Sequence, residues 1–118
     1  MHPAVKSVRY AVSGIVEAFR EEPNLRVHFI VGVVAVFFGI ILQISKDEWL
    51  ALSLSITVVL VLELLNTSIE ALTDLASPKI HPTAKLAKDV AAGAVLLAAA
   101  NAAIIGIVIF APKILALL

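Results

Sequence analysis

Three acids and one amide recur along residues 63–74 at spacings that an α-helix would align. They stand three, four and four residues apart, and they are Glu63, Asn66, Glu70 and Asp74. A helix carries positions with these spacings along one face. Glu63 also follows a long uncharged run, Trp49–Leu62, and an ionisable group inside a membrane helix is costly and usually functional. We therefore interpret Glu63 as a functional acid, whereas Glu70 and Asp74 alone would equally suit a solvated helix end.

Two lysines and an aspartate follow this stripe after a short turn. Lys85 and Asp89 stand four residues apart and could simply pair along one helix. Because a short turn makes the two helices antiparallel, we also expect Lys88 and Asp89 beside residues 70–74. Mg²⁺ typically takes one or two carboxylates together with substrate phosphates, and lysine supplies a point charge for phosphate. The pattern predicts a metal–polyphosphate site, to which Glu21–Glu22 could add a further carboxylate.

Motifs for several other chemistries are absent from the sequence. The five glycines are scattered, so no Gly-rich loop is available to cradle phosphates, and the protein-kinase signatures are missing. The chain has no cysteine, which excludes disulfides, thiolate nucleophiles and Cys-ligated metals. The three histidines, His2, His28 and His81, share no metal-ligand spacing. We interpret each as a surface or loop residue, although His81 falls in the turn facing the proposed site.

The composition indicates which class of protein must position these groups. Hydrophobic residues make up 61% of the 118 residues and charged residues 15%, against roughly 45–50% and 25% in soluble domains. A soluble globule of this size has too much surface to hide so much apolar area. The net charge of +0 provides no basic footprint for nucleic acids. We expect a single all-α integral membrane domain over residues 1–118.

Three apolar segments predict membrane helices, at residues 25–45, 48–76 and 83–111. A span needs roughly 20 apolar residues. At about 1.5 Å per residue, the second helix would be roughly 40 Å long, so its last third must emerge from the bilayer.

Prolines and polar residues predict the helix ends. The segment 21–24 reads as a turn around its proline. Ser45 or Asp47 could cap the second span, and Thr83 is a good N-cap for the third. Pro112 should close the last helix.

An amphipathic helix is expected over residues 3–22. Its apolar side chains recur every three or four residues, opposite a charged face; this pattern is typical of a helix lying in the membrane interface. The same stripe could instead pack on the chain's own membrane helices, and both arrangements stay open.

Basic residues predict the orientation in the membrane. Seven of the nine fall on one side: Lys6, Arg9, Arg20, Arg26, Lys79, Lys85 and Lys88. The positive-inside rule then places the N-terminus and the 75–88 connection in the cytoplasm.

The same residues resemble a known family, the prokaryotic diacylglycerol kinase / undecaprenol kinase family. The resemblance rests on the pattern E-x-x-N-x-x-x-E-x-x-x-D over residues 63–74, followed by His81 and by the triplet AKD at 87–89. It extends into residues 9–22 and covers nearly the whole chain. Residues 24–28 are similar to the Gram-positive branch, whose substrate is undecaprenol.

The resemblance implies an ATP-dependent, homotrimeric lipid kinase with active sites shared between subunits. It implies that Glu63 is the general base and Asn66 a neighbouring active-site amide. It further implies that Glu22 and Glu70 ligate Mg²⁺ and that Lys88 contacts the ATP phosphates. Other positions near the nucleotide are, by the same resemblance, Arg9, Tyr10, Asp74, His81 and Asp89.

The resulting hypothesis is transfer of the γ-phosphate of MgATP to the primary hydroxyl of a membrane lipid. The reaction would take place at the cytoplasmic face of a bacterial cell membrane. Undecaprenol, giving undecaprenyl phosphate, is the favoured acceptor, and diacylglycerol is the alternative. A proton- or ion-conducting oligomer could use the same acids, but a channel needs polar groups through the whole bilayer, and these are confined to one end of a span.

Overall fold

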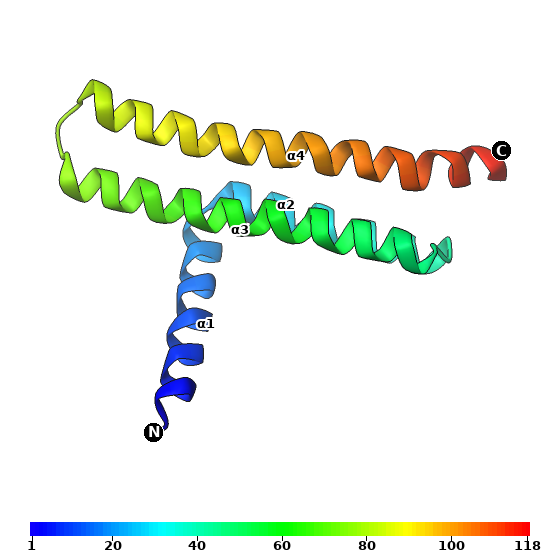
Figure 1. The fold of residues 1–118 in the computed structure, drawn as a ribbon, viewed down its shortest axis with the longest axis horizontal. Helices are drawn as coiled ribbons and strands as arrows, with labels where there is room; N and C mark the ends of the chain where they lie inside the picture. The colour runs from blue at the N-terminus through cyan, green and yellow to red at the C-terminus, as the bar shows by residue number, and fades with distance from the viewer.

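The computed structural model describes residues 1–118 as four helices (Figure 1). They are α1 (Pro3–Glu21), α2 (Pro23–Ile41), α3 (Lys46–Ala76) and α4 (Pro82–Leu117). Helices α3 and α4 run antiparallel over most of their length, α2 packs along α3, and α1 leaves the bundle at a steep angle. Helices α2, α3 and α4 are each long and apolar enough to cross a membrane. The all-α fold with three potential spans is therefore confirmed.

The start of α3 is fixed by a reciprocal cap. Ser45 Oγ accepts a hydrogen bond from the N–H of Glu48 at 3.2 Å, and Glu48 Oε1 accepts one from the N–H of Ser45 at 2.9 Å. This arrangement satisfies two N–H groups at the helix end that would otherwise lack partners. Ser45, and not Asp47, is the N-cap.

Helix α4 begins one residue earlier than expected, at Pro82. The Nδ1 atom of His81 accepts a hydrogen bond from the N–H of Thr83 at 3.1 Å, so His81 is the N-cap. The prediction that Thr83 caps this helix was wrong. Proline suits the first helical position because its missing N–H would have no partner there and its φ is already helical.

The same property of proline explains the junction between α1 and α2. Pro23 is the first residue of α2, and only Glu22 separates the two helices. The turn expected at 21–24 is thus reduced to one extended residue, with φ −108° and ψ 104°. Helix α2 ends at Ile41 rather than at residue 45.

Pro112 does not end α4, which continues to Leu117. The prediction that this proline closes the helix was wrong. An interior proline removes one backbone hydrogen bond, but the segment is also held by its neighbour. Lys113 Nζ lies 3.0 Å from Glu48 Oε2 at the start of α3, which ties the two helix ends together.

Close approach between α2 and α3 depends on glycine. A Cβ atom at Gly39 would lie 2.8 Å from Cη2 of Trp49, and one at Gly32 would lie 3.1 Å from Cγ2 of Ile56. Both glycines are buried. The aromatic and branched side chains of α3 therefore occupy the space that a larger residue on α2 would need.

Two contacts fix the corner between α1 and α2. Arg26 Nη1 donates to the carbonyl oxygens of Phe19 at 2.9 Å and Arg20 at 2.8 Å. These carbonyls belong to the last turn of α1 and have no partner within the helix. Phe19 and Phe29 meet edge to face, with ring centroids 5.1 Å apart. Before this corner, every residue of α1 up to Glu17 is exposed, so its apolar stripe is not covered by the rest of the chain.

Candidate active site

Glu63 lies inside the bundle, with only 3% of the residue exposed. Its Oε1 atom is 3.4 Å from Nε2 of His28, which α2 brings against α3. The main-chain oxygen of Glu63 accepts a hydrogen bond from Thr67 Oγ1 at 3.0 Å. Acids are almost never this deeply buried unless a partner compensates them. The apolar bundle therefore holds a buried carboxyl group with a neighbouring imidazole where α2 packs against α3.

His28 is the site residue that sequence reasoning missed. It was interpreted as a surface or loop residue, yet its side chain is only 27% exposed and it contacts the buried acid. No spacing within one sequence links it to Glu63, because the two residues belong to different helices. The one available signal was a polar, titratable residue inside the expected span 25–45.

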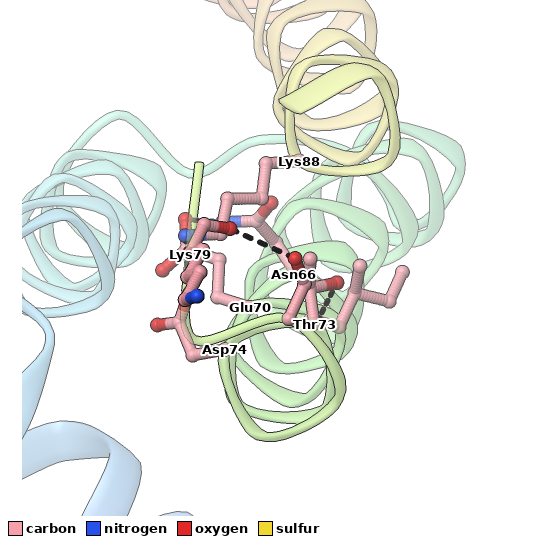
Figure 2. A network of polar contacts seen from close by, with 8 residues as sticks. Asn66, Glu70, Thr73, Asp74, Lys79 and Lys88 are labelled. Carbon is pink, nitrogen blue, oxygen red and sulfur yellow. Dashed lines mark hydrogen bonds and ion pairs between the residues drawn. The ribbon is translucent and has the colours of Figure 1, made fainter. Parts of the chain in front are cut away.

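The next polar group along the stripe is a side-chain pair. Asn66 Nδ2 donates to Glu70 Oε1 at 3.3 Å (Figure 2). The other atom of this amide, Asn66 Oδ1, is buried and has no hydrogen-bond partner. A buried acceptor without a partner is uncommon and calls for an explanation. Asn66 therefore faces Glu70 with its amide nitrogen and keeps a buried oxygen without a partner.

An ion pair joins α3 and α4 near the C-terminal end of α3. Lys88 Nζ pairs with Asp74 across the two antiparallel helices, and Figure 2 shows the lysine extending toward Glu70 and Asp74. This is the placement that the sequence predicted for Lys88. Asp89 instead pairs with Lys85 on its own helix, which is the simple i, i+4 contact considered as the alternative.

A polar cavity of about 280 Å³ lies between the end of α3, the connecting loop and the start of α4. Its lining comprises Asp74, Ser77, Pro78, Lys79, Ile80, His81, Ala84, Lys85 and Lys88. Three of these residues are lysines, so the cavity is suited to an anion such as a phosphate group. His81 also lines this cavity, in the turn where the sequence placed it.

The α1 residues expected near the nucleotide lie elsewhere in the single chain. Arg9 and Tyr10 line a hollow of about 390 Å³ on α1 together with Met1, Lys6 and Ser13. Tyr10 also borders a groove of about 480 Å³ between α1 and α3, on whose far side lie Leu64, Thr67, Ser68 and Ala71. One chain therefore does not bring Arg9 and Tyr10 into the lysine-lined cavity.

The protein ligands near Glu70 suit a cation whose coordination shell is completed by substrate phosphates. No three His, Cys, Asp or Glu side chains converge into a preformed metal site. Glu70, which is partly buried, nevertheless offers one carboxylate at this point of α3. Hard cations such as Mg²⁺ need only one or two protein carboxylates when substrate phosphates and water supply the other ligands.

Comparison with known proteins gives consistent relationships. The family described as prokaryotic diacylglycerol kinase matches residues 9–110. The undecaprenol kinase of Bacillus subtilis is 43% identical over 109 residues, which cover 92% of this chain and 89% of that protein. A diacylglycerol kinase of Synechocystis is 41% identical over 113 residues, or 95% of this chain and 65% of the relative. A diacylglycerol kinase of Pseudomonas aeruginosa is 34% identical over 75% of this chain and 72% of its own. The chain belongs to the prokaryotic diacylglycerol kinase family.

Proposed function

We propose that this protein is a lipid kinase that transfers the γ-phosphate of MgATP to the primary hydroxyl of a membrane lipid. The observation that carries the proposal is a polar stripe that passes from a dry to a wet environment along one helix. Glu63 is 3% exposed, Asn66 and Glu70 are partly buried, and Asp74 is exposed. Such a stripe lets a lipid headgroup in the bilayer meet a water-soluble phosphate donor.

Undecaprenol is the proposed acceptor. The undecaprenol kinase of Bacillus subtilis is 43% identical to this chain and has a similar length, which favours the polyprenol. Diacylglycerol is the second candidate, because other relatives with 34–41% identity are diacylglycerol kinases. Both lipids present a hydroxyl group at the interface while the rest of the molecule remains in the hydrocarbon.

Glu63 is the proposed general base. Its carboxylate accepts the proton of the lipid hydroxyl while that oxygen forms a bond to the γ-phosphorus. The bond between this phosphorus and the β–γ bridging oxygen breaks, and ADP leaves. Asn66 lies one turn along the helix, where its free Oδ1 can orient the incoming hydroxyl. Positioning and charge stabilisation account for most of the catalysis in phosphoryl transfer.

A second group of residues is proposed to bind Mg²⁺ and the phosphates of ATP. Glu22 and Glu70 would hold Mg²⁺, which supplies positive charge to the transferred phosphoryl group. Lys88 neutralises the ATP phosphates, for which it must exchange its present partner Asp74. The remaining proposed nucleotide contacts are Arg9, Tyr10, Asp74, His81 and Asp89.

A homotrimer with shared sites is part of the proposal. Its support is that Arg9 and Tyr10 lie outside the lysine-lined cavity of their own chain, so a neighbouring copy is needed to unite them with Lys88. The exposed apolar stripe of α1 suits a helix lying in the interface. We place the N-terminus and the site at the cytoplasmic face of a multi-pass bacterial membrane protein.

A phosphotransfer assay tests the proposal. The full chain in lipid vesicles is given labelled ATP and either undecaprenol or diacylglycerol, and the labelled lipid is counted. We expect the larger kcat/KM with undecaprenol and a loss of at least about 10²-fold in Glu63→Gln. Glu48→Gln, at the opposite end of α3, is the control and should retain activity. No phosphorylation of either lipid, or proton flux without ATP hydrolysis, would overturn the kinase assignment.

A further inference from the structure

His28 makes the one ion-pair contact of the buried acid. Its Nε2 atom lies 3.4 Å from Glu63 Oε1, and the Glu63 side chain is 5% exposed. No side chain donates a closer hydrogen bond to that carboxylate; Thr67 donates only to the main-chain oxygen. The polar contact of the Glu63 carboxylate thus comes from α2 rather than from its own helix.

The backbone that carries His28 is held in place by its neighbours. Two residues before it, Arg26 donates to the last carbonyls of α1. One residue after it, Phe29 packs edge to face on Phe19. Leu25, one turn earlier, is 2% exposed. His28 therefore projects toward Glu63 from a turn of α2 that several contacts hold in place.

We propose that His28 is a positioning residue for the kinase reaction: its Nε2–H holds Glu63 Oε1 and leaves Oε2 directed at the lipid hydroxyl. This inference rests on the proposed function. The separation of 3.4 Å is that of a loose contact, and catalytic hydrogen bonds are often long before substrate binds and shorten in the reacting complex. A general base must lie about 2.6–3.2 Å, measured between heavy atoms, from the hydroxyl oxygen whose proton it accepts.

Loss of this contact should reduce turnover rather than nucleotide binding. A displacement of a catalytic group by 1 Å can cost about 10²-fold in rate. His28 does not line the lysine-rich cavity, so the KM for ATP has no reason to change. A merely structural role would instead lower the amount of folded protein without altering the kcat of the folded fraction.

Three variants of the full chain in lipid vesicles test the inference. His28→Ala removes the donor, whereas His28→Gln replaces it with an uncharged N–H of similar reach. Val27→Ala is the matched control, because Val27 is the neighbouring residue and is 55% exposed. We expect kcat to fall 10- to 100-fold in His28→Ala with the KM for ATP within about twofold. The kcat of His28→Gln should be within about fivefold of the parent value, and the kcat of Val27→Ala should equal the parent value.

The outcomes separate this inference from the proposed function. If the parent protein phosphorylates no lipid, the kinase proposal itself fails. If the parent is active and His28→Ala keeps its kcat, or changes only the KM for ATP, His28 does not position Glu63. Equal loss in His28→Gln and His28→Ala would also overturn the inference. Should His28→Ala fail to fold, His28→Leu removes the donor while keeping most of the side-chain volume, and a kcat equal to that of Val27→Ala would overturn the inference.

Discussion

Lys88 of α4 pairs with Asp74 of α3 at the edge of the polar cavity, and so joins the two antiparallel helices next to the turn that connects them. The partners lie on opposite sides of the α3–α4 turn. The same ammonium group that joins the helices is the one proposed to meet the ATP phosphates. Lys88 is therefore proposed to serve both as a contact between the two helices and as a positive charge for ATP.

Removal of the Lys88 charge should weaken phosphate binding. We expect Lys88→Met to lower kcat/KM for ATP by about 10- to 100-fold, since hydrogen bonds to charged groups contribute about 1.5–3 kcal/mol. The measurement is initial rate against ATP concentration in lipid vesicles. Lys85→Met is the control, because Lys85 pairs with Asp89 on its own helix, and its effect should stay below about threefold. Similar losses in both variants would show that only the total positive charge of the cavity matters.

Addition of one methyl group at Gly39 should destabilise the bundle. The new Cβ atom would lie 2.8 Å from the Trp49 ring, so the ring or the helix must move, at a cost of about 1–3 kcal/mol. Thermal unfolding in detergent, followed by tryptophan fluorescence, measures the effect. Gly93→Ala provides the comparison, because no atom lies within 4 Å of a Cβ there, and alanine favours a helix by about 1 kcal/mol. Equal midpoints for the two variants would contradict the predicted clash.

Gln43 adopts a left-handed backbone conformation, with φ 51°, in the turn between α2 and α3. This conformation costs an L-residue about 1–2 kcal/mol, a cost that glycine avoids. Because glycine also gains freedom in the unfolded chain, we expect a net stabilisation of about 0.5–1 kcal/mol in Gln43→Gly. The measurement is the unfolding midpoint in detergent, with Gln43→Ala as the comparison. A midpoint for Gln43→Gly at or below that of Gln43→Ala would refute the expectation.

Lys113→Met should affect stability without affecting catalysis. Lys113 pairs with Glu48 at 3.0 Å, and both side chains are about one-third exposed or less. Exposed pairs contribute about 0.2–1 kcal/mol, so a small decrease in the unfolding midpoint is expected. Because the pair lies at the opposite end of α3 from Asp74, kcat should be unchanged. A decrease in kcat of more than about twofold would show that this pair also controls the site.

Regularities within a single helix could be predicted from the sequence. The spacing of Glu63, Asn66 and Glu70 defined one face, and the short turn after α3 placed Lys88 against that face. Both predictions depend only on helical periodicity and on the antiparallel course of two connected helices. The role of each residue in catalysis stays a prediction.

Contacts between distant segments could not be predicted in the same way. His28 meets Glu63 because α2 packs along α3, and no local pattern encodes that register. Helix α4 continues through Pro112 to Leu117 where it lies beside the start of α3, with Lys113 in contact with Glu48. Helix propensity correctly marks proline as unfavourable inside a helix. Propensity takes no account of contacts with a neighbouring helix.

The unequal lengths of the helices have a consequence for the bilayer itself. Helix α2 begins five residues before His28, whereas α3 continues thirteen residues beyond Glu63. At about 1.5 Å per residue, α3 and α4 extend about 12 Å past α2 as a pair. In a thick bilayer, the hydrocarbon would extend to Lys88 and Asp74 and remove water from both charges. In a thin bilayer, water would reach as far as Glu63. Hydrophobic mismatch of this kind is resolved by tilt or by local deformation of the lipid, so the separation of Glu63 and Asp74 along α3 should make the tilt of the α3–α4 pair respond to membrane thickness.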